Sequence, residues 1–188
     1  MTRVDFPTLH QITRNIRAWI ARATPEQAQA GEQWYFSAHQ WCRELSEESG
    51  VDFPRVVGVL AALSPSTAWE RNQADARAMV LGYGAWSFTT YSTNVERAKR
   101  ILVGELSALS GQKVTAFADC LANPHWTSAV CVDRHAYSLA TGLQEGSLHQ
   151  NRFDLIATAY RRVAQQFGIK PHQAQAIAWV TYREDKRS

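Results

Sequence analysis

The sequence has only three cysteines, Cys42, Cys120 and Cys131, an odd number spread widely along the chain. No two of them form a Cys-x-x-Cys pair, and no histidines or carboxylates stand at the spacing of the common zinc motifs. A disulfide framework, a zinc ribbon and a zincin-type metal site are therefore not expected. We predict a protein that needs neither a metal nor a cofactor.

Long apolar runs are also missing. No stretch approaches the roughly 20 apolar residues that cross a membrane, and the chain does not open with a signal peptide pattern. With 45% hydrophobic and 20% charged residues among 188, the composition is that of one ordinary globular domain. We expect no membrane partner and a reducing, cytoplasmic location.

Positive charge is in excess only near the C-terminus. Residues 151–188 carry seven basic residues (Lys and Arg) and three acidic residues (Asp and Glu), a net charge of +4. Residues 1–150 carry 13 basic and 14 acidic residues, a net charge of −1. A basic segment of this kind suits a polyanionic partner, and a solvated tail explains it equally well.

Apolar residues recur at helical spacing through nearly the whole chain, and alternation of period two is confined to residues 87–91. The longest stripe advances in steps of three and four residues through Phe153, Ile156, Tyr160, Val163 and Phe167. Helix boundaries are marked by Thr24-Pro25, which is typical of a helix start, and by Gly168, which is typical of a helix end. The sequence predicts an all-α protein of eight to ten helices.

Two short motifs carry the functional information. Residues 106–114 read Leu-Ser-Ala-Leu-Ser-Gly-Gln-Lys-Val, and residues 132–135 read Val-Asp-Arg-His. In this order the pair resembles the helix-hairpin-helix DNA glycosylases, of which endonuclease III is the best-known type. The resemblance implies an all-α fold of two helical subdomains with a cleft between them, and DNA as the partner. The family's C-terminal iron–sulfur cluster is not expected, since its four cysteines are absent.

The first motif resembles the family's hairpin, in which a tight turn and a helix N-terminus present backbone N–H groups to a DNA phosphate. The residues that would take this role are Leu109, Ser110, Gly111 and Gln112. Leu109 stands where the family has its first glycine, and leucine adopts a positive φ only at a cost. Lys113 stands at the place of the family's Schiff-base lysine, and the alternative is a lysine that is solvated or pairs with phosphate.

The second motif places Asp133 at the position of the family's catalytic aspartate. Cleavage of an N-glycosidic bond builds positive charge on the sugar, which an ionised carboxylate stabilises. The alternative is that Asp133 only caps the helix that follows it. The resemblance adds Arg134 and His135 to the DNA-binding set, although His135 is also read as a structural partner of a backbone carbonyl.

The remainder of the chain matches the family over about residues 55–183. The segment 59–67, Val-Leu-Ala-Ala-Leu-Ser-Pro-Ser-Thr, resembles the helix whose following loop lies beside the extruded base, and 97–101 and 176–183 resemble two later helices. The resemblance therefore adds a second group to the DNA-binding set: Ser64, Ser66, Thr67, Trp69 and Asn72.

Residues 1–50 do not match the family, so we predict two amphipathic helices there that pack on a glycosylase-like domain at 51–188. Their Trp19, Trp34 and Trp41 are expected in the core. The segment 34–72 also looks like a group of phage-borne proteins, which implies a distant branch. We expect a DNA glycosylase with possible lyase activity. A non-catalytic DNA-binding module, a transferase that modifies DNA pyrimidines, and an all-α phage accessory protein that binds another protein are the alternatives.

Overall fold

The computed structural model describes residues 6–84, 86–144 and 149–186, which form nine α-helices, one short 3₁₀ helix and no strand. The predicted all-α class is thereby confirmed. None of the helices in these residues is long and apolar enough to cross a membrane. The elements are α1 (Leu9–Ala21), α2 (Pro25–Ser49), α3 (Phe53–Leu63), α4 (Trp69–Val80), α5 (Ser92–Leu102), η1 (Leu106–Ala108), α6 (Gln112–Ala122), α7 (Arg134–Thr141), α8 (Gln150–Phe167) and α9 (Pro171–Asp185).

The chain divides into two compact units. The first unit comprises residues 1–35 and 126–188, and the second unit comprises residues 36–125. One of their boundaries falls inside α2, because this 25-residue helix continues without a break from Tyr35 to Phe36. The boundary predicted at residue 50 lies within the second unit, and the glycosylase-like domain at 51–188 stays a prediction.

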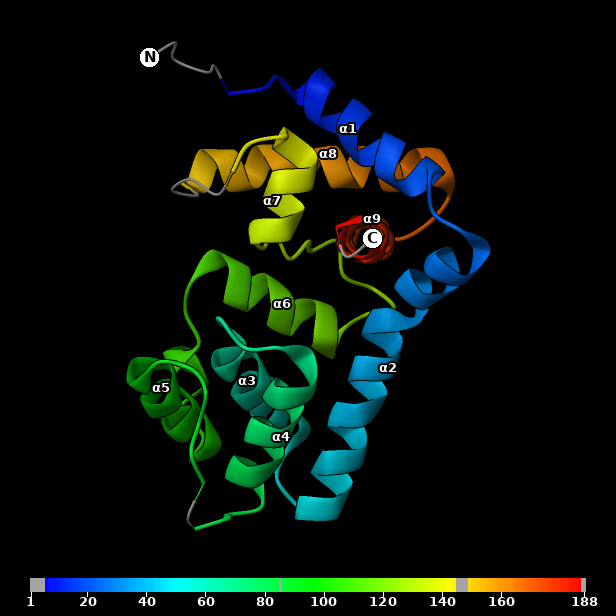
Figure 1. Ribbon diagram of the computed structural model, residues 1–188. Coiled ribbons are helices and arrows are strands. Elements are labelled where there is room, and N and C mark those ends of the chain that lie inside the picture. Colours follow the sequence, from blue (N-terminus) through cyan, green and yellow to red (C-terminus); the bar gives the residue numbers. More distant parts are fainter. Residues whose placement is uncertain (1–5, 85, 145–148, 187–188) are drawn as a thin grey trace. The chain divides into compact units, whose positions relative to one another are not determined.

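The first unit is built around α1, which contacts α7, α8 and α9 (Figure 1). Its core is aliphatic and aromatic, with Ile12 and Ile16 of α1 and Ile156 and Tyr160 of α8 fully buried. The start of α2 approaches α9 so closely that a Cβ added to Gly31 would lie 2.5 Å from the Ile177 backbone. Glycine is required at that position because no side chain fits.

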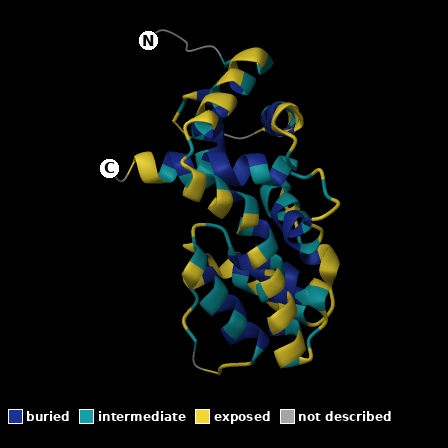
Figure 2. Cartoon of the chain, turned by 90° about the vertical axis from the view of Figure 1, so that its right-hand side faces the viewer, coloured by how far each residue is buried: buried dark blue, intermediate teal, exposed yellow. Residues whose placement is uncertain are grey.

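The second unit is built around α3, whose residues 56–63 are all buried. This helix contacts α4, α5 and α6, as Figure 1 shows. An apolar helix that is buried on every side needs neighbours all round, and the sequence of residues 56–63 supplies only Val, Gly, Leu and Ala. In Figure 2 several helices show exposed residues on one face and buried residues on the opposite face.

Candidate functional site

The segment 106–114, which resembles the glycosylase hairpin, follows α5 and folds as η1 and the start of α6. Helix α6 begins at Gln112, and Gly111 precedes it with φ 93° and ψ 130°. No side chain caps this helix end, so its first amides depend on other partners. A Cβ added to Gly111 would meet nothing within 4 Å. Glycine is therefore needed for the backbone conformation and not for lack of space.

Leu109 does not adopt the positive φ that a glycine at this position could adopt. Its φ is −67° and its ψ is 115°, which is extended backbone. The turn therefore differs from the family's hairpin at this position, as the cost of a positive φ for leucine suggests. Leu109 is half-buried, and the neighbouring Ser110 and Gly111 are exposed.

Lys113 and Asp133 belong to different units of the chain. Lys113 lies half-buried in the first turn of α6, in the second unit, and Asp133 lies directly before α7, in the first unit. Each is therefore described with its own neighbours. Their convergence on one nucleoside stays a prediction.

Asp133 is the N-cap of α7, and both of its carboxylate oxygens accept hydrogen bonds. Oδ1 accepts from the Ala136 amide at 2.7 Å, and Oδ2 accepts from the Trp179 indole Nε1 at 3.3 Å. The first bond is the ordinary capping interaction. The second comes from α9 and was not visible in the sequence, because 46 residues separate the partners. The carboxylate is thus half-buried and held in one orientation by two helices.

Aromatic and cationic side chains lie beside Trp179 and His135, the neighbours of this carboxylate. The Arg183 guanidinium lies 4.5 Å from the centre of the Trp179 ring, and the Lys186 ammonium lies 4.6 Å from that of Tyr182. His135 packs against both rings, at 6.5 Å and 6.3 Å between centroids. Cations over aromatic faces are weakly stabilising at exposed sites, and the ring under Arg183 is that of Trp179, which donates to Asp133.

Burial governs the titration of the groups next to Asp133. Loss of water lowers the pKa of His135, the nearby Asp133 carboxylate raises it, and the charges of Arg134, Arg183 and Lys186 lower it further. His135 is therefore neutral at pH 7 and belongs to the packing of α7 on α9. Burial, and then the Asp133 charge, raise the pKa of Tyr160, whose hydroxyl lies 3.5 Å from the Ala136 carbonyl oxygen. Arg134 is exposed.

The loop from α3 to α4 holds the other predicted DNA contacts. Ser66 is exposed and has a φ of 62°, a conformation that non-glycine residues adopt at a cost. Thr67 fixes the loop by donating to the carbonyl oxygens of Leu63 and Pro65, at 3.1 and 3.2 Å. Ser64 turns inward in the same way, because its hydroxyl donates to the Ala61 carbonyl at 2.8 Å.

Asn72 and Trp69 do not lie on the surface of this loop in the way the resemblance implied. Asn72 is only 2% exposed, and its Nδ2 donates to the Leu60 carbonyl at 3.1 Å. Its side chain therefore joins α4 to α3, and its role in DNA binding stays a prediction. Trp69 is half-buried as the first residue of α4.

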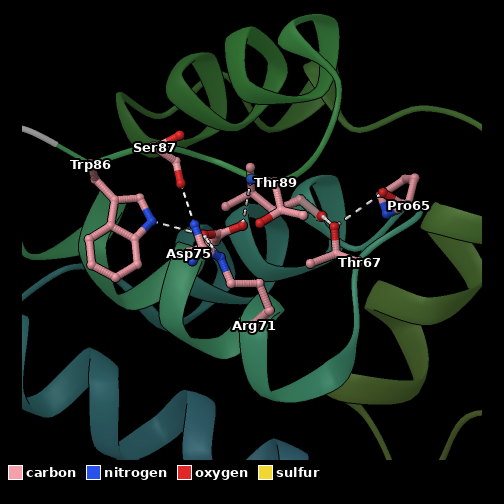
Figure 3. Close-up of polar contacts among 8 residues, drawn as sticks. Pro65, Thr67, Arg71, Asp75, Trp86, Ser87 and Thr89 are labelled. Atoms are coloured by element: carbon pink, nitrogen blue, oxygen red, sulfur yellow. Dashed lines mark hydrogen bonds and ion pairs between the residues drawn. The ribbon is translucent and has the colours of Figure 1, made fainter.

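Asp75 is a buried carboxylate that accepts several hydrogen bonds, and the sequence motifs did not indicate it. Its Oδ1 accepts from Arg71 Nε and from Trp86 Nε1, each at 2.8 Å, and its Oδ2 accepts from the Thr89 amide at 3.1 Å (Figure 3). Arg71 also donates to the Ser87 carbonyl. The cluster therefore fastens the irregular segment 86–90 to α4. The i,i+4 spacing of Arg71 and Asp75 was its only signal in the sequence.

Thr90 connects this cluster to the α3–α4 loop. Its hydroxyl donates to the Pro65 carbonyl at 2.9 Å and accepts from Asn94 Nδ2 at 2.8 Å. The loop that bears Ser66 is thus tied to Thr90 in the segment between α4 and α5, and through Thr90 to Asn94 of α5. The strained φ at Ser66 persists because its surroundings are this well determined.

Positive charge is unevenly divided between the units. The first unit has 12 basic residues (Lys and Arg) and 8 acidic residues (Asp and Glu), a net charge of +4. The second unit has 8 basic and 9 acidic residues, a net charge of −1. In the second unit five of the eight basic residues form ion pairs. Among the described residues of the first unit, Arg22 pairs with Asp185. The net positive charge of this unit suits an anionic partner.

Comparison with known proteins gives a family and no activity. Within the described residues no group of three or more His, Cys, Asp or Glu side chains could hold a metal ion. No curated protein and no solved structure matches the chain significantly. Residues 2–186 match the model of a family of unknown function, DUF7178, and the chain therefore belongs to that family.

Proposed function

We propose that the protein binds DNA and cleaves the N-glycosidic bond of a nucleotide extruded from the helix, with Asp133 as the catalytic carboxylate. The observation that carries this proposal is the arrangement of Asp133, whose two oxygens are fixed by the Ala136 amide and the Trp179 indole. A carboxylate that is already oriented stabilises a developing sugar cation without having to reorganise.

The chemistry needs one ionised carboxylate and one nucleophile. The bond from C1′ to the base breaks, its electron pair leaves with the base, and positive charge develops on the sugar next to Asp133. A water oxygen then bonds to C1′ and its proton passes to the carboxylate. In a bifunctional enzyme the Lys113 amine takes the place of water and the sugar opens to an imine.

The α5–α6 segment supports a helix-hairpin-helix role in DNA binding. Gly111 keeps the second glycine of the resemblance and has a positive φ, and α6 begins beyond it without a side-chain cap. Such a helix end is suited to a phosphate, because its amides and its dipole both favour an anion. The net charge of +4 on the unit that contains Asp133 favours the same partner.

A non-catalytic DNA-binding protein is the second candidate. The capping bond from Ala136 to Asp133 favours it, since this bond alone gives the aspartate a structural reason to be present. In that case DNA affinity falls steeply with salt and does not depend on Asp133.

The Asp133→Asn variant separates the two candidates, because asparagine caps a helix about as well as aspartate. We expect the variant to stay folded, with a loss of about 1 kcal/mol because the amide nitrogen cannot accept the Trp179 hydrogen bond. Its DNA affinity should be kept while base release slows on the order of a hundredfold, about 3 kcal/mol of transition-state stabilisation. Base release is measured on single- and double-stranded oligonucleotides that carry natural, oxidised and hydroxymethylated pyrimidines. The exposed Asp154, changed to Asn, is the matched control for loss of one negative charge in the same unit.

Trapping with borohydride tests Lys113 independently. A covalent adduct on abasic DNA that disappears in Lys113→Gln identifies a lyase, and base release without an adduct identifies a glycosylase that uses water. Unchanged base release by Asp133→Asn, or no base release from any substrate by the natural protein, would contradict the catalytic proposal.

A further inference from the structure

Trp126 is the most exposed large hydrophobic residue in the described part of the chain. It lies between α6 and α7 and is 90% exposed. The unit that contains Trp126 therefore leaves this ring largely to solvent, although tryptophan is among the residues most stabilised by burial.

The turn that presents Trp126 is well determined. Pro124, two residues earlier, is buried and has a restricted φ. Two residues later the Ser128 carbonyl accepts from Arg161 Nε of α8 at 2.9 Å, and the Thr127 hydroxyl accepts from the Ala129 amide at 2.9 Å. The ring is thus displayed by a fixed backbone on both sides. A partner that binds it does so without first ordering the loop.

Arg161 brings positive charge to the same turn. Its Nε is used by Ser128, and its guanidinium forms no ion pair in the described residues. Ser128 lies two residues from Trp126, a separation of at most about 7 Å along the backbone. An arginine whose Nη groups remain available is suited to a phosphate oxygen.

We propose that Trp126 and Arg161 form a binding site for an unpaired nucleotide, with the indole stacked on the base and the guanidinium on the adjacent phosphate. This inference rests on the proposed function and names a second contact of that DNA. Single-strand binding proteins combine these two elements, an aromatic platform and a cation. A base within a duplex already stacks on both faces, so the site selects single strands, bulges and gaps.

The sequence around Trp126 argues against a protein partner. The sequence neighbours Asn123, His125, Thr127 and Ser128 are polar, whereas the centre of a protein interface is mainly apolar. The unit that contains Trp126 has a net charge of +4, which complements a nucleic acid.

Binding of oligothymidylate, measured by fluorescence anisotropy, tests the stacking contact. We expect Trp126→Ala to weaken binding about 5- to 150-fold, as for other stacked bases, and to weaken binding of a fully paired duplex much less. Trp126→Phe should retain part of the affinity. Tyr91→Ala is the matched control, because Tyr91 is 66% exposed, is also aromatic and lies in the other unit.

The salt dependence of the same binding tests Arg161. Arg161→Gln should reduce the slope of log K against log salt concentration by about 0.7, the value for one phosphate contact on a single strand. Arg97→Gln removes the same charge from an exposed position of the second unit, and we expect it to leave the slope unchanged. Circular dichroism and thermal unfolding show that each variant is folded.

The outcomes separate this inference from the proposed function. If the natural protein binds DNA and Trp126→Ala binds oligothymidylate equally well, the stacking site is wrong and the proposed function stands. If the natural protein binds neither single- nor double-stranded DNA at low salt, the proposed function fails and the site with it. If Trp126→Ala changes only self-association in size-exclusion chromatography, the ring contacts a second copy of the chain and the inference is overturned.

Discussion

The indole nitrogen of Trp179 lies 3.3 Å from Oδ2 of Asp133, and the other carboxylate oxygen of Asp133 accepts the Ala136 amide. Helix α9 thus helps to orient Asp133, the N-cap residue of α7. A residue that holds the carboxylate in this way is a positioning residue for the proposed reaction, and it can be tested without any substrate.

Trp179→Phe removes the N–H donor and keeps an aromatic ring beside His135. We expect the variant to lower the free energy of unfolding by about 1 kcal/mol, the usual contribution of one hydrogen bond. Urea denaturation of Trp179→Phe, Asp133→Asn and the double variant gives the coupling energy of the pair. Strictly additive effects would show that the indole and the carboxylate do not interact in solution.

The fold class could be predicted from local patterns, because helix periodicity and caps are properties of neighbouring residues. The stripe that ends at Phe167 forms α8, Gly168 follows it with a φ of 67°, and α2 begins at Pro25. The division into units could not be predicted in this way. It depends on which helices pack together, and α2 contributes to both units.

The side chains of the candidate site were only partly predictable for the same reason. The role of Gly111 follows from its own backbone, whereas the Asp133–Trp179 bond and the buried Asp75 depend on tertiary contacts. The exposure of tryptophans shows this limit clearly. Trp19, Trp34 and Trp41, which were expected in the core, are half-buried, and Trp126 is exposed although nothing in its sequence context indicates it.

The hydrogen bonds that Asp75 accepts predict that replacing this one residue destabilises the protein. Asp75→Asn keeps the shape of the side chain and removes the charge that Arg71, Trp86 and Thr89 satisfy. We expect the free energy of unfolding to fall by about 2 kcal/mol, as for loss of hydrogen bonds to a charged group. Chemical denaturation measures this loss, and limited proteolysis should cut the segment 86–90 faster.

The exposed Asp154, which accepts a hydrogen bond from Gln150 one helical turn away, is the control for the Asp75 variant. Asp154→Asn should change the free energy of unfolding by less than about 0.5 kcal/mol, because surface pairs of this kind contribute little. Equal effects of the two variants would contradict the role of Asp75 as the anchor of the segment.

Gly111 allows backbone strain to be tested apart from steric crowding. An added Cβ meets no atom within 4 Å at Gly111 or at Gly84, but only Gly111 has a positive φ, of 93°. We expect Gly111→Ala to destabilise the protein by about 1–2 kcal/mol, and Gly84→Ala to do so by much less. Thermal and urea unfolding compare the two. If the hairpin holds a phosphate, Gly111→Ala also weakens duplex binding at low salt.

His135 makes stability depend on pH in a defined direction. Burial is the main reason that its pKa lies below the ordinary value of 6.5, and the charges of Arg134, Arg183 and Lys186 act in the same direction against that of Asp133. Below pH 6.5 the unfolded chain therefore binds a proton that the folded chain does not yet accept. The stability that comes from the neutral ring is complete above pH 6.5 and is lost as the pH falls toward the lowered pKa.

The same linkage predicts what removal of the imidazole does. In His135→Gln the part of the pH dependence that begins below pH 6.5 should disappear, so the free energy of unfolding, measured in urea from pH 7.5 to pH 5, should fall less steeply than in the natural protein. An unchanged slope would mean that His135 meets the same environment in the folded and unfolded chain. The packing of this ring between Trp179 and Tyr182 would then not persist in solution, and the orientation of Asp133 by α9 would lose its support.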